Sequence, residues 1–365
     1  MAFLEPAAGV RFGYGGLHLT TIARRLPGAT TFKAAYKWLS RFLKNRYFDP
    51  AGLAPAMIRL LVGRKPPDWL LVLIDQTHVG GVEVVSAAIP FEGRAVPVAW
   101  PDFEYPWSQV RIPSPNAIEQ IWLVWVREAL PPGVRALPVL DRGYARADLI
   151  GQLNRARQPF LLRGLKKVLV KAWVRGREQR FFLGRLPHRL GVPTRFSNVL
   201  YHQVKQERVD VIVYREREFQ DAWFLIVPPQ SEAWLPTETV VELYRRRMQI
   251  EHRFRDWKNH LGLRGLELQV NKSERLLRLL MAFTLADLLT LLPGQDELAR
   301  PARGFFEYCR RRPRHGTRRV LSVLSLALLL LDHPRFQVEA RRRLDSLIRR
   351  PARGCGCALT TPLPP

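Results

Sequence analysis

Cysteine is scarce in this sequence, which contains only Cys309, Cys355 and Cys357 among its 365 residues. The last two form a Cys-x-Cys pair, but no second cysteine pair or histidine cluster stands at the spacing of a zinc site. We therefore interpret the three cysteines as free thiols and expect neither a disulfide framework nor a structural zinc ion.

Apolar runs of membrane-spanning length are also lacking. Val320 to Leu331 is about a dozen residues long and is followed by Asp332, whereas a membrane-spanning helix needs roughly 20 residues. The start, Met1 to Val10, lacks the basic residues and the long apolar stretch of a secretory signal. We therefore expect no membrane partner and a cytoplasmic protein.

Acidic residues are few beside the basic ones. The chain has 32 Asp and Glu against 58 Lys and Arg, which gives a net charge of +26. Most of these cations are arginines, whose guanidinium groups suit phosphate, so a polyanion is the expected partner. A charge that serves solubility or contact with the ribosome is the alternative, but solubility does not require so large an imbalance.

Helical periodicity runs from Leu17 to Leu61. Apolar residues share one face of a first helix and, beyond a Pro27-Gly28 break, one face of a second, namely Leu19, Ile22, Ala23 and Leu26, then Phe32, Tyr36, Leu39 and Phe42. The second helix also carries a series of cations, Lys33, Lys37, Arg41, Lys44 and Arg46. A small DNA-binding module and an ordinary helical subdomain with a charged surface both fit this pattern.

Beyond the linker Arg64-Lys65-Pro66-Pro67, apolar strands lead to aspartates. Trp69 to Ile74 is a continuous apolar run, typical of a strand buried on both faces, and we expect it to end at Asp75. Asp141 follows a second such strand. The predicted elements of this α/β core are strands over Val82–Ala88, Ala95–Trp100 and Ala136–Leu140, with a helix over Ile118–Leu130.

Short alternating segments follow and predict a β-rich insertion, with strands over Val168–Val174, Gln179–Leu183, Val209–Tyr214 and Ala222–Val227. A long helix is then predicted from Pro236 to about His260, with Thr239-x-x-Glu242 as a capping box. The remainder, from about Asn271, is helical and basic.

One stripe of the long helix contains residue types that can bind phosphate and a metal ion. At 100° per residue, a stripe about 60° wide contains Tyr244, Arg247, Glu251 and Lys258. The adjoining stripe is apolar and would bury the helix, through Leu243, Ile250, Phe254, Trp257 and Leu261. Cations and a phenol can hold a phosphodiester while a carboxylate holds a metal ion; a surface of i, i+4 salt bridges is the alternative.

Asp75, Asp141 and Glu251 come from three separate elements and offer the oxygen ligands that Mg²⁺ prefers. In-line displacement at phosphorus is served by two such ions roughly 4 Å apart, one at the attacking oxygen and one at the leaving oxygen. Either aspartate taken alone could instead cap a turn or a helix.

Two motifs resemble those of a known family. Asp141-Arg142-Gly143-Tyr144, and Tyr244-x-x-Arg247-x-x-x-Glu251 with Lys258 seven residues later, look like the second-aspartate and YREK motifs of the insertion-sequence-4 family of DDE transposases. Asp75-Gln76-Thr77 resembles the first-aspartate motif, with Gln76 where a small residue is more usual. The segment Arg41-Phe42-Leu43-x-Asn45 resembles the family's helical DNA-binding region.

The resemblance implies a ribonuclease-H-like α/β core interrupted by a β-rich insertion, with helical N- and C-terminal regions. The corresponding divisions are 1–66 (helical DNA-binding region), 67–164 (first part of the catalytic core), 165–229 (insertion), 230–270 (second part of the core) and 271–365 (helical basic region, a candidate for dimerisation).

It also implies cut-and-paste transposition. In that scheme Asp75, Asp141 and Glu251 hold two Mg²⁺ or Mn²⁺ ions, while Tyr244, Arg247 and Lys258 bind DNA phosphate. The partners are double-stranded DNA, as terminal inverted repeats and as target, and a second copy of the chain in a synaptic dimer at the bacterial nucleoid.

Two other hypotheses stay open, namely a catalytically inactive DNA-binding protein derived from a transposase and a related metal-dependent nuclease. An aromatic residue of the insertion stacks on a flipped base in relatives of this family. Trp223 and Trp234 are candidates for that role, and core packing is the alternative for each.

Overall fold

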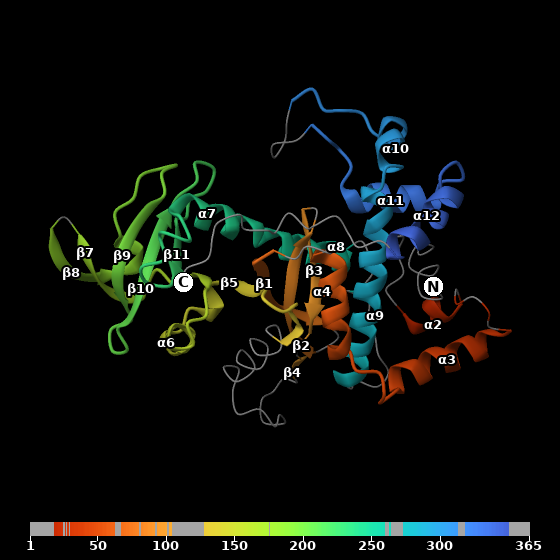
Figure 1. Ribbon diagram of the computed structural model, residues 1–365, viewed down its shortest axis with the longest axis horizontal. Coiled ribbons are helices and arrows are strands. Elements are labelled where there is room, and N and C mark those ends of the chain that lie inside the picture. The colour runs from red at the N-terminus through yellow and green to blue at the C-terminus, as the bar shows by residue number, and fades with distance from the viewer. Residues whose placement is uncertain are drawn as a thin grey trace.

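The computed structural model of the protein (Figure 1) describes residues 18–24, 26, 28, 30–62, 67–79, 82–91, 93–100, 102–103, 128–174, 176–259, 263, 273–312 and 318–349. Several predictions therefore lie outside the described residues: most of the linker 64–67, the helix over Ile118–Leu130 except for its last residues, Leu261, and the pair Cys355 and Cys357. Cys309 is an exposed free thiol.

A single mixed sheet runs through the molecule. Its strands are β1 (Trp69–Val79), β2 (Val82–Phe91), β3 (Arg94–Ala99), β4 (Asp102–Phe103), β5 (Arg135–Leu140), β6 (Leu161–Arg163), β7 (Leu169–Val174), β8 (Arg177–Phe182), β9 (Thr194–Tyr201), β10 (Glu207–Tyr214) and β11 (Trp223–Val227). The described part of this 11-stranded sheet has the order β3-β2-β1-β5-β6-β11-β10-β9-β7-β8, and β4 pairs with β2. The α/β class predicted from the sequence is confirmed.

Strand β1 differs from its prediction at its end. It does not stop at Asp75 but continues to Val79, because residues from Asp75 onward stay paired with antiparallel β2. Its parallel ladder with β5, in contrast, ends at the pair Ile74–Leu140. Asp75 thus lies where β1 loses one neighbour and keeps the other, which leaves its β5-side edge open.

The β-rich segment shares the sheet of the core. Strand β11 pairs with β6 in antiparallel orientation, and Leu225 lies opposite Arg163. The four predicted strands are present with shifted ends, and a fifth, β9, was missed because its polar residues break the alternation that a sequence pattern needs. The boundaries 165 and 229 remain a prediction.

Helices cover both faces of this sheet. They are α2 (Leu19–Ala23), α3 (Phe32–Lys44), α4 (Ala54–Val62), α6 (Ala147–Arg155), α7 (Thr237–Arg246), α8 (Met248–Asn259), α9 (Ser273–Leu291), α10 (Ala299–Phe306), α11 (Val323–Asp332) and α12 (Gln337–Arg349). Helices α4, α8 and α9 contact β3 and share one apolar core with β1, whereas α6 packs in a second core on the opposite face.

The N-terminal helices pack against the C-terminal region. Helix α3 contacts α9, and buried Arg278 of α9 donates from Nη1 to the Leu43 carbonyl at 2.9 Å and from Nε to the Phe48 carbonyl at 3.2 Å. A cation at a helix C-terminus satisfies free carbonyls and complements the helix dipole. The face of α3 is shifted from the predicted one, since Phe32 is 46% exposed.

Helix α9 is long and apolar enough to cross a membrane by length and composition, over the stretch Glu274–Gln295. However, 78% of its apolar window is buried inside the protein. Figure 1 shows α9 between the sheet and the helices of both terminal regions, the position of a core helix.

A buried ion pair ties the β-rich segment to the start of α7. Arg195 of β9 donates from Nη1 to Asp210 Oδ2 of β10 at 2.9 Å and from Nε to Thr237 Oγ1 at 3.1 Å. The side chains of Arg195 and Asp210 are 5% and 1% exposed. Because neither charge reaches water, each depends on the other.

We expect Asp210→Ala to lower the free energy of unfolding by about 3–5 kcal/mol, since it leaves the buried Arg195 charge with only the exposed carboxylate of Glu232, 3.9 Å from its Nε. Glu216→Ala is the control, because Glu216 pairs with Arg245 at the surface and an exposed pair contributes under about 1 kcal/mol. Urea unfolding measures both; equal small losses would show that the buried pair is not a structural requirement.

Candidate active site

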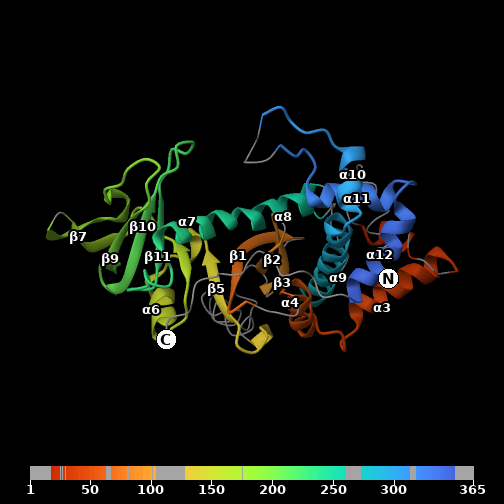
Figure 2. The same cartoon turned by 45° about the horizontal axis from the view of Figure 1, so that its top comes forward.

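Helices α7 and α8 lie end to end along the sheet (Figure 2) where one long helix was predicted. They meet at Arg247, whose N–H donates to the Tyr244 carbonyl at 3.0 Å, an i to i−3 bond that tightens the turn. The backbone of Arg247 stays right-handed, so the axis continues. The predicted capping box is wrong: α7 begins at Thr237 after Pro236, and Thr239 lies inside the helix.

The two stripes predicted on this helix are confirmed as far as they are described. Leu243, Ile250, Phe254 and Trp257 are buried in the main core. Tyr244, Arg247 and Glu251 project together toward the place where the β1–β5 ladder stops, and there they meet Asp75 and Asp141. Lys258 is half-buried and lies seven residues beyond Glu251, about 10 Å further along the helix axis.

Asp75 and Asp141 lie side by side because of strand register. Each is the next residue after the last parallel pair of β1 and β5, and neighbouring strands run about 4.8 Å apart. Asp75 Oδ1 accepts the N–H of Gln76 at 2.9 Å. Asp141 precedes a 3-10 turn without capping it through its side chain, and its Oδ1 accepts the phenol of Tyr244 at 3.2 Å.

The guanidinium of Arg247 contacts all three predicted carboxylates. Its Nη1 lies 3.3 Å from Asp75 Oδ2, its Nη2 lies 3.9 Å from Asp141 Oδ1, and Nη2 also donates to Glu251 Oε1. Arg247 is only 5% exposed, and its Cζ lies 5.9 Å from the centre of the Tyr244 ring. The structure thus brings Asp75, Asp141 and Glu251 to one point, and a buried cation occupies it.

Burial controls the electrostatics of this cluster. The pKa of Asp75 is raised from 3.8 to about 6, chiefly by loss of solvation and to a smaller extent by the charges of Glu251 and Asp141, against the opposing effect of Arg247. Burial likewise raises the pKa of Tyr244 to about 12, so its phenol stays protonated at neutral pH. The site therefore contains a carboxyl group that gains its proton about one pH unit below neutrality and a hydroxyl donor that keeps its proton.

The donor types fit hard divalent cations, because carboxylate oxygens of three elements converge at one place. In the part of the chain that the structure describes, however, no group of three or more His, Cys, Asp or Glu side chains is placed so that it could hold a metal ion. The carboxylates are bridged by Arg247 instead. A metal ion would therefore have to compete with the guanidinium for the same oxygens.

Basic residues beside this cluster were not singled out from the sequence. Arg142, Arg163, Lys166 and Lys167 line a cavity of about 370 Å³ at the ends of β5 and β6, together with Asp221. Arg163 lies close enough to lower the pKa of Tyr244. Arg163 could have been found by the same pattern that identified Asp75. In both cases a charged residue directly follows buried strand residues, which here are Leu161 and Leu162.

The two tryptophan candidates both pack against the main core. Trp234 stacks on Trp69 with ring centres 5.7 Å apart and planes 7° from parallel. Trp223 is half-buried and meets the Tyr244 ring edge-on at 5.1 Å. The core-packing alternative therefore accounts for Trp234, while Trp223 is part of the wall of the candidate site.

Residues 110–286 match the family model described as "Transposase DDE domain". The match covers slightly less than half of the chain, and this stretch is similar to a transposase DDE domain. It contains Asp141, Tyr244, Arg247, Glu251 and Lys258, whereas Asp75 lies before it. The match is to a broad domain family and does not test whether the chain belongs to the YREK group within it.

A solved structure titled "Cryo-EM structure of piggyBac transposase synaptic complex with hairpin DNA" is similar with a TM-score of 0.36 and 10% sequence identity. The alignment covers 78% of this chain and 58% of that one, so the chain spans less than two thirds of the length of the piggyBac protein. No curated protein matches the chain.

The raised pKa of Asp75 predicts a pH-dependent stability. Because the folded protein binds this proton more tightly than the unfolded chain, ionisation of Asp75 destabilises the fold, increasingly from about pH 4 and fully above about pH 6. Asp75→Asn should therefore stabilise the metal-free protein at pH 8, by on the order of 3 kcal/mol, and change little at pH 4. Urea unfolding at both pH values measures this; a pH-independent effect would contradict the raised pKa.

Proposed function

We propose that the protein is a DDE transposase that cleaves and transfers DNA strands at the ends of an insertion sequence by metal-dependent cut-and-paste chemistry. The observation that supports this most is the convergence of Asp75, Asp141 and Glu251 on one guanidinium, beside and within the DDE domain. Three carboxylates from separate elements meet at the open edge of two parallel strands. Such an arrangement costs free energy and is expected where cations bind.

Strand order supports a ribonuclease-H-like core as part of this proposal. The described sheet has an antiparallel meander β3-β2-β1, followed by the parallel neighbours β5 and β6. In this order the first aspartate lies on the central strand β1 and the second follows its parallel neighbour. The glutamate comes from the helix that packs across both β1 and β3.

The proposed roles follow from the contacts. Asp75, Asp141 and Glu251 would hold two Mg²⁺ or Mn²⁺ ions, which supply an activated water and stabilise the leaving oxygen. Once the carboxylates have that partner, Arg247 is available for the scissile phosphate, to which a guanidinium can donate two parallel hydrogen bonds. The Tyr244 phenol, which stays protonated, can donate a third. Lys258 would bind a more distant phosphate of the same strand.

Duplex DNA is the proposed partner, as terminal inverted repeats and as target. The net charge of +26 supports this, and so does the outer surface of α3, where Lys33, Lys37, Arg41 and Lys44 are exposed and no acidic residue occurs. A synaptic homodimer at the bacterial nucleoid is part of the same proposal. We assign the dimer contact to the C-terminal helical region.

The two alternatives differ in the fate of the carboxylates. A DNA-binding protein without catalysis needs no acids among its phosphate contacts, and the complete set of three disfavours it. A nuclease that cuts without joining uses the same metal ions, so only the products of the reaction separate it from a transposase.

Asp141→Ala and Glu251→Gln should each reduce cleavage of a duplex that carries the terminal repeats flanking the gene by more than about 100-fold, the upper range seen for residues that only support metal ligands. DNA binding should persist, because each change removes negative charge near phosphate. Gel assays with Mg²⁺ measure nicking and strand joining. Asp148→Asn, an exposed acid of α6, is the control.

The outcomes separate the hypotheses. End-specific nicking and joining by the wild type alone would support a transposase. Nicking without joining would favour the nuclease, and binding without any cutting would favour the inactive DNA-binding protein.

Binding should also weaken steeply with salt. Each neutralised phosphate contributes about −0.9 to the slope of log K against log salt, so we expect a slope steeper than about −4 for the wild type. Replacing Lys33, Lys37, Arg41 and Lys44 by Gln should make it shallower by up to about 3.6. Fluorescence anisotropy measures both, with Arg155→Gln of α6 as the control. A wild-type slope near zero would contradict a polyanionic partner.

A further inference from the structure

The side of α8 that faces away from Glu251 contains a buried ion pair. At 100° per residue, Arg253 and Trp257 lie roughly 200° and 240° around the helix from Glu251. Arg253 Nη1 lies 2.8 Å from Asp287 Oδ2 of α9, and the two side chains are 0% and 1% exposed. One helix thus presents a site carboxylate on one side and a fully buried charge on the other.

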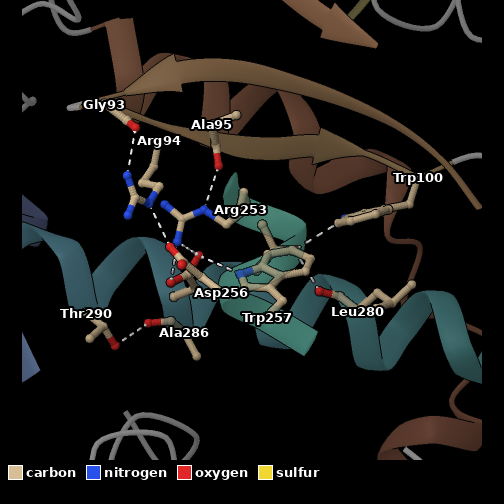
Figure 3. Close-up of polar contacts among 12 residues, drawn as sticks. Gly93, Arg94, Ala95, Trp100, Arg253, Asp256, Trp257, Leu280, Ala286 and Thr290 are labelled. Carbon is tan, nitrogen blue, oxygen red and sulfur yellow. Dashed lines mark hydrogen bonds and ion pairs between the residues drawn. The ribbon is translucent and has the colours of Figure 1, made fainter. Parts of the chain in front are cut away.

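This pair fixes α8 to two other elements (Figure 3). Arg253 Nε donates to the Ala95 carbonyl of β3 at 2.7 Å, and Trp257 Nε1 donates to Asp287 Oδ2 at 3.0 Å. Nearby, Arg94 of β3 donates from Nε to Asp256 Oδ2 at 2.7 Å. Directional hydrogen bonds from three residues within little more than one turn, Arg253, Asp256 and Trp257, leave α8 little freedom to rotate or slide.

Stability alone does not explain this pair. Both side chains are withdrawn from water, and burial raises the pKa of Asp287 in spite of its cationic partner, so desolvation opposes the pair. Arg253 Nη2 has no hydrogen-bond partner among the described residues. Apolar residues of similar volume at such positions often make a protein as stable or more stable.

The geometry of a helix turns small rotations into large displacements. The carboxylate of Glu251 lies about 6–7 Å from the helix axis, given a Cα radius of about 2.3 Å, so a rotation of about 10° moves it by about 1 Å. Displacements of that size at a reacting centre can cost about 100-fold in rate. The rotation of α8 is therefore a quantity that the proposed chemistry depends on.

We propose that Asp287 is a positioning residue, which sets the rotation of α8 through Arg253 and Trp257 and so aims the Glu251 carboxylate at Asp75 and Asp141. The inference rests on the proposed function, because it gives Glu251 its role as a metal ligand. It adds that a residue of α9, in the C-terminal helical region, takes part in building the site without touching it.

Two variants test this, Asp287→Asn and the apolar double variant Arg253→Met with Asp287→Leu. The double variant should melt near the wild-type temperature, because removal of two buried charges offsets the partners lost by the Ala95 carbonyl and Trp257 Nε1. Both should bind Mn²⁺ about 10-fold more weakly by electron paramagnetic resonance and cleave about 10- to 100-fold more slowly in single turnovers, with unchanged affinity for duplex DNA. Arg343→Met is the control, since it removes an ion pair with Asp296 far from α8.

A merely structural pair would give a different result. If the double variant loses activity only in proportion to its unfolded fraction, or folds and then binds Mn²⁺ and cleaves like the wild type, the positioning role is overturned while the proposed function stands. If the wild type neither binds Mn²⁺ nor cuts DNA, the proposed function fails and this inference fails with it.

Discussion

The rest of the structure depends on the contact of one buried guanidinium with three carboxylates. Like charges as close as those of Asp75, Asp141 and Glu251 repel one another unless a cation lies among them. Arg247 supplies that cation in this structure, and its burial keeps the interaction from being screened by salt. Even so, the pKa of Asp75 is about 6, so this carboxyl group binds its proton more tightly than an ordinary aspartate does. The remaining elements must hold these four groups together against a net electrostatic cost, and the sheet and the helix pair do so differently.

The sheet fixes two of the carboxylates by register alone, because consecutive positions on paired parallel strands cannot shift independently. The helix pair has no such ladder and is fixed by buried ion pairs near both ends. Arg195 and Asp210 bind the start of α7 to the β-rich segment, and Arg253 and Asp287 bind α8 to α9. Between these two fixed points lies Arg247, at the one turn where the helical hydrogen bonding tightens. Such turns are common at functional positions.

Sequence patterns predicted the parts of the fold that depend on local periodicity. The apolar run of β1, the apolar stripe of α8 and the shared face of Tyr244, Arg247 and Glu251 follow from spacing, and the structure contains them. A local sequence pattern cannot show which strands pair with one another in the sheet. The extension of β1 past Asp75 depends on β2 as its neighbour, and the joining of the β-rich segment to the core depends on the ladder between β11 and β6. Strand β9 was missed for the same reason, since it is held by its partners more than by its own residues.

The candidate site, too, was predicted in part from residue spacing and in part depends on contacts that spacing does not show. Spacing placed the three carboxylates on suitable elements, but the role of Arg247 as their common counter-ion depends on side-chain directions from three elements. The contact of this arginine with the carboxylates and its proposed contact with phosphate also exclude each other in space. While its nitrogens bind carboxylate oxygens they are not free for phosphate, and while it occupies the centre of the cluster a divalent ion has no place there. In the proposed function, metal entry and phosphate binding by Arg247 are therefore coupled, because a cation that replaces the guanidinium at the carboxylates would also release it. In the proposed function, such a site offers Arg247 to a phosphate only when another cation has become the partner of the carboxylates.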